Sequence, residues 1–293
     1  MNAIQPLSAV DWSLGYVAEF DLESPTEVGD AAREAFANDG VVCLRNAFSE
    51  HWLDTIETGI EQVLARPGIN SYNIKADPSD DGFFFYDTLM WQHTDPLKAF
   101  IFDSNAPDLY RSLLATDKLF FYYDFLIIKN AGCEQSATPW HHDIAYYPLD
   151  GTQIANCWTA LDRIPFETAL RFVRGSNNFD TIYRATHFDP EDDYDKLMTS
   201  RPEVLDFDQM AADGECEIVS CEMSPGDSLV FNCRTLHCAP GNHLGTRRAA
   251  FSTNWAGDDV VYRDIPQETD PSYRGEGLVD GGSIECKSFP RVR

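Results

Sequence analysis

Two histidines and one aspartate are the residues of this sequence whose types and spacing best suit chemistry. His141 and Asp143 flank His142, and His237 lies far downstream. On a β-strand, residues i and i+2 point to the same face, so His141 and Asp143 can bind one metal ion while His142 points away. Two histidines and a carboxylate on one side of a metal, with the other positions open, are the ligand set of non-heme Fe(II) oxygenases. We therefore predict a metal site at His141, Asp143 and His237, with room for O2 and a co-substrate.

The position of His237 strengthens this prediction. It follows the apolar run 228–231 and comes just before the turn-forming residues 240–242. A His-x-Asp pair alone is weak evidence for a metal. A further histidine at the end of a strand, where side chains can reach an open metal, makes a shared ion the better interpretation. We assign His142 a structural role.

Arg248, a short way past His237, predicts an anionic ligand. A guanidinium binds a carboxylate through two parallel hydrogen bonds, and a buried arginine without an anionic partner is costly. A dicarboxylate that chelates iron at one end would leave its far carboxylate for Arg248. The alternative is a structural or surface ion pair. Arg247 is adjacent and must face the other way on a strand.

The first part of the chain predicts helices that flank this site. Ser24-Pro25-Thr26-Glu27 matches a helix start with a capping box, and Asn38-Asp39-Gly40 ends that helix. A short apolar strand is expected at 41–44. Further helices are expected after Ser49 and over 103–114.

The second part of the chain predicts strands. Its segments rich in β-branched and aromatic residues are separated by turn signals, and they cover 119–129, 154–161, 170–173, 216–221, 228–232 and 247–255. Helices followed by many short strands indicate a helical layer packed on a two-sheet β structure. We predict a single domain over 1–293, with the helical layer at about 24–115 and the β core at about 119–256.

Two segments have open interpretations. Residues 69–95 are expected to be rich in loops, with a turn-forming stretch at 77–82. The aromatic run 83–86 either caps the core or walls a substrate pocket. The acidic stretch 179–215 is either a solvated surface segment or a mobile lid.

The composition excludes several classes of protein. The formal net charge of −26 opposes binding to nucleic acid or to anionic membranes. No apolar run approaches the roughly 18 residues of a membrane span, and the first residues do not resemble a secretory signal. The eight cysteines form no C-x-x-C pair, which favours reduced thiols and a cytoplasmic location. The oligomeric state stays open.

The order and spacing of several motifs resemble the phytanoyl-CoA dioxygenase family of Fe(II)/2-oxoglutarate-dependent oxygenases. The resemblance covers roughly residues 27–255. The matching pieces, besides His237, are 140–148, 158–162, 169–173, 224–231 and 248–252. It implies a mainly β fold with flanking helices around a double-stranded β-helix, the jelly-roll or cupin-like core.

The resemblance also implies roles for the site residues. His141, Asp143 and His237 would bind Fe(II), and Arg248 would bind the 2-oxoglutarate carboxylate. Trp158 falls where family members pack an aromatic residue near the co-substrate, and Thr159 is a second candidate there. Related halogenases replace the carboxylate ligand with a small residue. Asp143 is retained here, which favours hydroxylation-type chemistry.

We therefore expect an oxidoreductase, a non-heme dioxygenase that hydroxylates an unactivated C–H bond of a small or medium metabolite and releases succinate and CO2. We expect a neutral or cationic substrate. Desaturation, epimerisation or ring formation would begin in the same way. The alternatives are a metal-dependent cupin-like isomerase or hydrolase, which would not need Arg248, and a non-catalytic metal-binding sensor.

Overall fold

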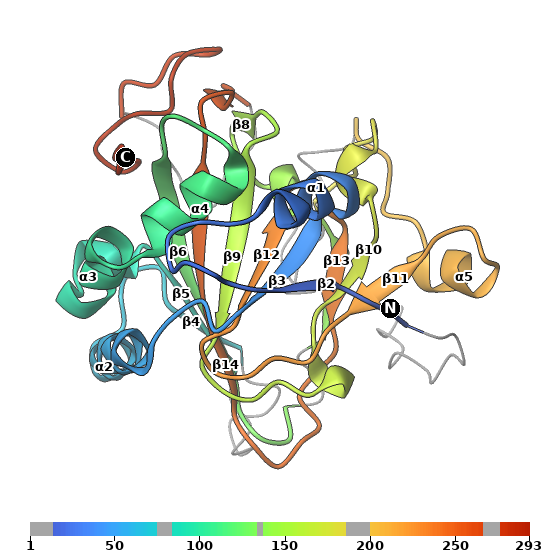
Figure 1. The fold of residues 1–293 in the computed structure, drawn as a ribbon, viewed down its shortest axis with the longest axis horizontal. Coiled ribbons are helices and arrows are strands. Elements are labelled where there is room, and N and C mark those ends of the chain that lie inside the picture. Colours follow the sequence, from blue (N-terminus) through green and yellow to red (C-terminus); the bar gives the residue numbers. More distant parts are fainter. Residues whose placement is uncertain (1–13, 75–83, 134–136, 186–199, 266–275) are drawn as a thin grey trace.

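The fold is built from two β-sheets and a layer of helices (Figure 1). The computed structural model describes residues 14–74, 84–133, 137–185, 200–265 and 276–293. The expected turn at 77–82 lies outside these residues, as do Phe83 and the central part of the 179–215 segment. No helix among the described residues has the length and apolar character needed to cross a membrane.

The larger sheet has eight strands in the order β2-β3-β12-β9-β14-β6-β5-β4. Their bounds are β2 (Ala18–Asp21), β3 (Val41–Arg45), β12 (Ser228–Asn232), β9 (Ile154–Ala160), β14 (Arg248–Ala256), β6 (Phe120–Lys129), β5 (Phe84–Thr88) and β4 (Tyr72–Ile74). The long pair β14 and β6 runs antiparallel through its centre. This sheet forms one wall of the molecule.

The second sheet has five strands in the order β1-β11-β10-β13-β7. Their bounds are β1 (Gly15–Tyr16), β11 (Ile218–Ser220), β10 (Arg171–Val173), β13 (His237–Ala239) and β7 (Thr138–His141). A separate two-stranded antiparallel sheet joins β8 (Leu149–Asp150) and β15 (Val261–Tyr262), which are distant in sequence. The expected double-stranded β-helix, or jelly roll, is confirmed.

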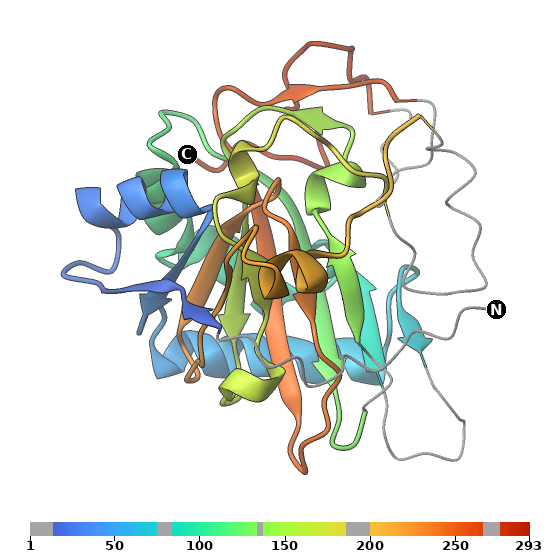
Figure 2. The same ribbon diagram turned by 90° about the vertical axis from the view of Figure 1, so that its right-hand side faces the viewer.

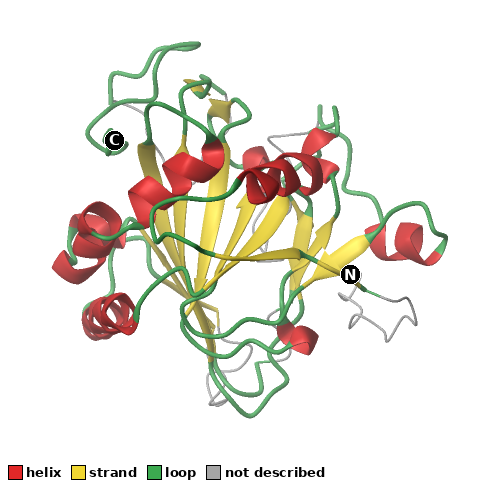
Figure 3. Cartoon of the chain, viewed as in Figure 1, coloured by secondary structure: helices red, strands yellow, loops and turns green. Residues whose placement is uncertain are grey.

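Helices cover the outer face of the larger sheet (Figures 1 and 3). They are α1 (Asp30–Asp39), α2 (Glu50–Ala65), α3 (Asp95–Asp103) and α4 (Ala106–Leu114), and α5 (Phe207–Ala212) lies apart beyond β11. In the turned view, α2 lies crosswise to the strands (Figure 2). Within the described residues, four 3-10 turns connect these elements: η1 (Met90–Gln92), η2 (Asp143–Ala145), η3 (Phe166–Thr168) and η4 (Ser176–Asn178).

Strand alternation divides the side chains of the larger sheet between two cores. On β9, Ala155 and Cys157 belong to the helix-facing core, whereas Trp158 and Ala160 belong to the core between the sheets. On β14, Phe251 faces the helices in the same way. Because successive residues of a strand point to opposite faces, every even-numbered residue of β14 from Arg248 to Asn254 faces the interior.

The predicted start of the first helix is wrong. α1 begins at Asp30 with Gly29 before it, and the Ser24 hydroxyl instead accepts the Thr26 N–H at 3.4 Å. The Val28 N–H donates to the Ser112 hydroxyl at 3.0 Å. This tertiary bond holds the segment extended where the capping box predicted a helix. The predicted end is confirmed, since Gly40 caps α1 with φ of 78°.

One further expectation for the first part of the chain was wrong. Phe84 to Tyr86 lie in β5, which pairs with β6 in the larger sheet, so this part of the 69–95 segment is not a loop. The helix expected over 103–114 is confirmed as α4, which starts at Ala106 with Pro107 in its first turn. The strand β5 forms through its pairing with β6, which is distant in sequence, so no local signal predicted it.

A buried carboxylate links β6 to η1. Asp124 is fully buried on the helix-facing side of β6, and its side chain accepts the Trp91 N–H at 2.8 Å. Burial, aided by the nearby carboxylate of Asp87, raises the pKa of Asp124 from its ordinary 3.8 to about 7. The folded protein therefore keeps a proton that the unfolded chain releases above about pH 4, so the stability due to this group falls as pH rises from about 4 to about 7.

Replacing Asp124 by asparagine keeps the hydrogen-bond acceptor and removes the titration. We expect Asp124→Asn to be more stable than the wild type at both pH values, by on the order of 1 kcal/mol at pH 5 and by on the order of a few kcal/mol at pH 8, because the unfolded wild type already loses its proton above about pH 4. Equilibrium denaturation at both pH values measures the difference. An equal difference at pH 5 and pH 8 would contradict the assigned pKa.

Candidate metal centre

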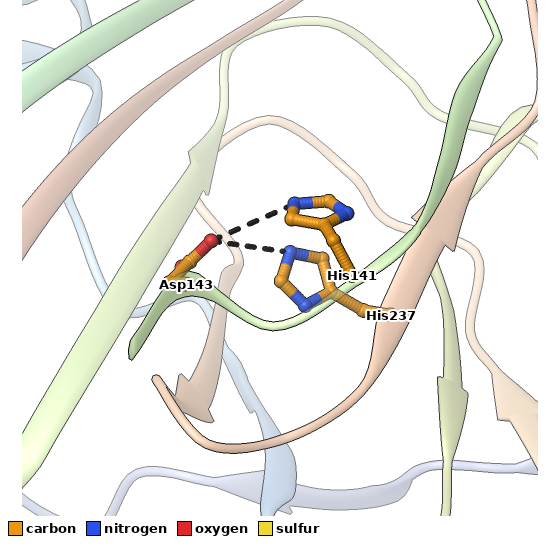
Figure 4. Close-up of side chains that lie close together, drawn as sticks. All are labelled: His141, Asp143 and His237. Carbon is orange, nitrogen blue, oxygen red and sulfur yellow. Dashed lines mark ion pairs between the residues drawn. The ribbon is translucent and has the colours of Figure 1, made fainter. Parts of the chain in front are cut away.

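His141, Asp143 and His237 come together as the sequence predicted (Figure 4). The Nε2 atoms of His141 and His237 each lie 3.6 Å from Oδ1 of Asp143. One donor atom of each residue lies within 4.8 Å of the others, and these three form the only such group of metal-binding side chains within the described residues. The three donors can therefore bind one ion from one side.

Strand pairing positions the two histidines. His237 on β13 and His141 on β7 are direct partners in the antiparallel ladder, and their rings lie 4.1 Å apart. Asp143 lies beyond the end of β7, in η2, so the expectation that His141 and Asp143 share one strand face is wrong. The Ile144 N–H donates to the Cys233 carbonyl at 2.9 Å. This bond turns the chain, and the turn directs the carboxylate toward the histidines.

The protonation of both imidazoles suits metal binding. Nδ1 of His141 contacts the Pro139 carbonyl at 2.8 Å, and Nδ1 of His237 contacts the Thr235 carbonyl at 2.9 Å. A carbonyl only accepts, so each Nδ1 carries the proton and each Nε2 keeps its lone pair. Burial lowers the pKa of His141 to about 3, with His237 adding to the effect, and burial lowers the pKa of His237 to about 4.

Asn156 orients the carboxylate. Its side-chain amide on β9 donates to Oδ2 of Asp143 at 3.2 Å, which leaves Oδ1 toward the two imidazoles. Burial raises the pKa of Asp143. A divalent cation would offset that burial, because an ionised carboxylate in an apolar interior needs a positive partner.

His142 has the structural role that we expected. It is buried, and its Nε2 accepts the Tyr183 N–H at 3.0 Å. Nearby, the Arg201 guanidinium donates to the Ala145 carbonyl at 3.2 Å. These two contacts tie the described ends of the 179–215 segment to β7 and η2.

Arg248 is the first residue of β14 and faces the interior. Asn156, which contacts Asp143, faces the interior as well, and it pairs with Asn254 near the other end of β14. It is 5% exposed, its Nη1 donates weakly to the Pro240 carbonyl at 3.4 Å, and it lies 5.3 Å from the Trp158 ring. Its strand partner on β6 is Lys129, which is 1% exposed. Burial lowers the pKa of Arg248 to about 10, and that of Lys129 well below its usual value, with Arg248 contributing.

The interior face between these two ends fits a polar ligand. Ala160, Ala250 and Ser252 are small residues on that face. Buried polar atoms there have no hydrogen-bond partner in the described part of the chain, namely Arg248 Nε, Ser252 Oγ, Asn254 Nδ2 and Asn156 Oδ1. Buried polar groups are normally paired, so a row of unpaired ones indicates a ligand. A dicarboxylate between the triad and Arg248 can accept hydrogen bonds from Arg248 and Ser252, which leaves the Asn156 oxygen and the Asn254 amide for another ligand.

Thr159 does not belong to the site, and that prediction is wrong. It is the strand neighbour of Trp158 and therefore points to the other face of β9. Its partner on β12 is Ser228, whose hydroxyl bonds the Tyr110 hydroxyl at 2.9 Å in the helix-facing layer. Trp158 does face the interior, as expected.

Sequence reasoning missed three side chains of the site. Asn156 and Ser252 are direct neighbours of residues that were identified, and strand alternation from Trp158 and Arg248 would have found both. Lys129 is the last residue of an expected strand, and only the pairing of β6 with β14 shows that it lies beside Arg248.

The comparisons with known proteins agree with this geometry. The family model for phytanoyl-CoA dioxygenase (PhyH) matches residues 36–250. The chain belongs to this family of Fe(II)/2-oxoglutarate-dependent enzymes. Among curated proteins, no sequence matches this chain.

Solved structures with the same fold differ in their chemistry. One is SnoK, a non-heme alpha-ketoglutarate-dependent carbocyclase from nogalamycin biosynthesis, with a TM-score of 0.70, 20% identity, and coverage of 92% of this chain and 98% of its own. Another is the epimerase SnoN with Fe3+, alpha-ketoglutarate and nogalamycin RO, with a TM-score of 0.66, 20% identity, and coverage of 90% and 100%. A third is EctD from S. alaskensis with 2-oxoglutarate and 5-hydroxyectoine, with a TM-score of 0.59, 16% identity, and coverage of 86% of both chains.

The geometry of β9 yields a test of the metal centre. Asn156→Ala removes the amide that orients Asp143, and we expect it to weaken Fe(II) binding about 10- to 100-fold. Thr159→Val, on the opposite face of the same strand, should bind Fe(II) like the wild type. Anaerobic calorimetry of Fe(II) binding compares the two variants. The assignment fails if Thr159→Val weakens binding as much as Asn156→Ala.

Proposed function

We propose that this protein is an Fe(II)- and 2-oxoglutarate-dependent oxygenase that hydroxylates a C–H bond of a small or medium-sized metabolite, releasing succinate and CO2. The observation that carries the proposal is the presence of two features in the interior between the two sheets. A one-sided triad of metal donors lies on β7, η2 and β13, and two buried basic residues, Arg248 and Lys129, lie on β14 and β6 of the larger sheet.

Different residues would bind the iron and the co-substrate. His141, Asp143 and His237 would hold Fe(II), and Arg248 with Lys129 would bind the far carboxylate of 2-oxoglutarate, with Ser252 as a further donor. When both are bound, they would activate O2, which is the oxidant both for the decarboxylation of 2-oxoglutarate and for the removal of hydrogen from an unactivated carbon. Burial keeps the imidazoles neutral by lowering the pKa of both histidines, and the Pro139 and Thr235 carbonyls hold the remaining proton on Nδ1.

The surrounding side chains limit water at the reacting position. Phe172 stacks on the His237 ring at 5.8 Å, and Phe231 lies 4.7 Å from the same ring. Both phenylalanines are almost fully buried. A dry environment of this kind strengthens electrostatic interactions and suppresses side reactions.

Hydroxylation is the outcome that the ligand set supports best. Asp143 occupies the position that an open halide site would need. Carbocyclisation and epimerisation, the activities named for SnoK and SnoN, begin with the same hydrogen removal and differ in what the substrate does next. The substrate's own geometry therefore decides between them, and product analysis distinguishes them.

Loss of the carboxylate ligand tests the oxygenase proposal. We expect Asp143→Ala to abolish O2-dependent release of succinate from 2-oxoglutarate, because two histidines alone hold iron poorly. Asp54→Ala, which removes an exposed carboxylate on α2, is the matched control and should retain activity. Succinate release that persists in Asp143→Ala, or that needs no O2 in the wild type, would favour an isomerase, a hydrolase or a metal-binding sensor.

Removal of the buried guanidinium tests the co-substrate site separately. Arg248→Met should raise the KM for 2-oxoglutarate about 100-fold or more, since a buried charge-assisted pair is lost. Fe(II) affinity should stay at the wild-type level because Arg248 does not contact the triad. Steady-state kinetics and Fe(II) calorimetry on the same preparation measure both. An unchanged KM would remove Arg248 from the co-substrate site.

A further inference from the structure

The interior-facing residues of β9, β14, β6 and β5 form one continuous face of the larger sheet, which we call the interior wall. On β6 and β5 this wall carries aromatic side chains. Tyr86 and Ile127 are direct partners in the ladder, and Phe125 lies one row closer to the metal. The Tyr86 and Phe125 rings meet edge to face at 4.6 Å. All three side chains are half-buried, whereas Leu126 and Ile128, which point to the helices, are buried. Solvent therefore reaches this wall from the interior side.

A polar group lies where the aromatic wall meets the metal centre. Asn254 is the direct strand partner of Asn156, the residue that orients Asp143. The Asn254 carbonyl oxygen accepts the Tyr147 hydroxyl at 3.3 Å, and the Tyr147 and Tyr123 hydroxyls lie 2.8 Å apart. The buried amide nitrogen of Asn254 has no partner among the described residues. This donor can serve an oxygen atom of a ligand beside the metal.

The charges around this wall favour a neutral molecule. The carboxylates that β5 and β6 carry, Asp87 and Asp124, lie on the helix-facing side of the sheet. The interior cations Arg248 and Lys129 are assigned to the co-substrate. No charged side chain of β5 or β6 on this wall is thus left for a charged substrate. The acidic composition of the chain suggested a neutral or cationic substrate. The charges near this wall narrow that expectation to a neutral substrate.

We infer that the substrate of this site is a neutral, flat, unsaturated ring compound that carries a hydroxyl or carbonyl oxygen. Its ring packs against Tyr86 and Phe125, and its oxygen accepts the Asn254 amide. An edge-to-face or offset contact with an aromatic ring is favourable beyond the area that it buries, which a saturated ring of equal size does not reproduce. This inference rests on the proposed function and names the substrate class of the same site.

Three probe molecules of similar size test the inference by binding alone. They are 1-naphthol, its saturated counterpart decahydro-1-naphthol, and the cation 1-naphthylmethylammonium. Dissociation constants are measured by calorimetry on the full chain with Fe(II) and 2-oxoglutarate under argon. We expect 1-naphthol to bind at least about fivefold more tightly than either of the others.

Substitutions at Tyr86 test whether its ring causes the preference for 1-naphthol. Tyr86→Leu should reduce the preference for 1-naphthol over decahydro-1-naphthol to about twofold or less, and Tyr86→Phe should retain it. Phe85→Leu is the matched control, because Phe85 is the strand neighbour that faces the helices, and it should retain the preference. Thermal unfolding of each variant separates loss of the ring from loss of the fold.

Equal or tighter binding of the saturated alcohol, tighter binding of the cation, or a preference that survives Tyr86→Leu would overturn the inference. The proposed function fails differently. Selective binding of 1-naphthol without O2-dependent succinate release from any substrate would refute the oxygenase while the ligand class stands. Succinate release by a protein that prefers decahydro-1-naphthol would refute the ligand class alone.

Discussion

The pairing of His141 with His237 across β7 and β13 is the contact on which the rest of the site depends. It brings two imidazoles to a ring separation of 4.1 Å in the buried interior. Two carbonyls fix their protons on Nδ1, and one carboxylate faces both Nε2 nitrogens. Neutral imidazoles beside a buried carboxylate lack a positive charge, and a divalent cation supplies it. The jelly roll is the scaffold that makes this pairing possible.

The same strand alternation that builds the cores also organises the chemistry. Asn156 and Asn254 lie beside the metal, and small residues separate them from the cations Arg248 and Lys129. On β6 and β5 the wall becomes aromatic. The residues that we assign to the co-substrate and to the substrate therefore share the interior face of the larger sheet, beside the triad on β7, η2 and β13. A substitution moved by one residue along these strands would reach the helix-facing core instead.

Most of the strands and all three residues of the triad could be predicted from sequence, because apolar runs, turn residues and residue types suited to a metal are local signals. The start of α1 could not, since a hydrogen bond from Val28 to the distant Ser112 overrides the capping signal. Thr159 was misassigned because resemblance alone ignores the face of the strand. Lys129 was missed because its role depends on its partner in β14, and no local signal shows strand pairing.

The central claim is that 2-oxoglutarate binds to iron held by this triad. Anaerobic titration of the Fe(II)-loaded protein with 2-oxoglutarate, followed by visible absorption, tests it most directly, because chelation of iron by the keto acid produces a charge-transfer band. The account predicts a saturable band in the wild type and in Thr159→Val, and its loss in His237→Ala. Absence of the band in an iron-loaded wild type, or its persistence in His237→Ala, would contradict the account.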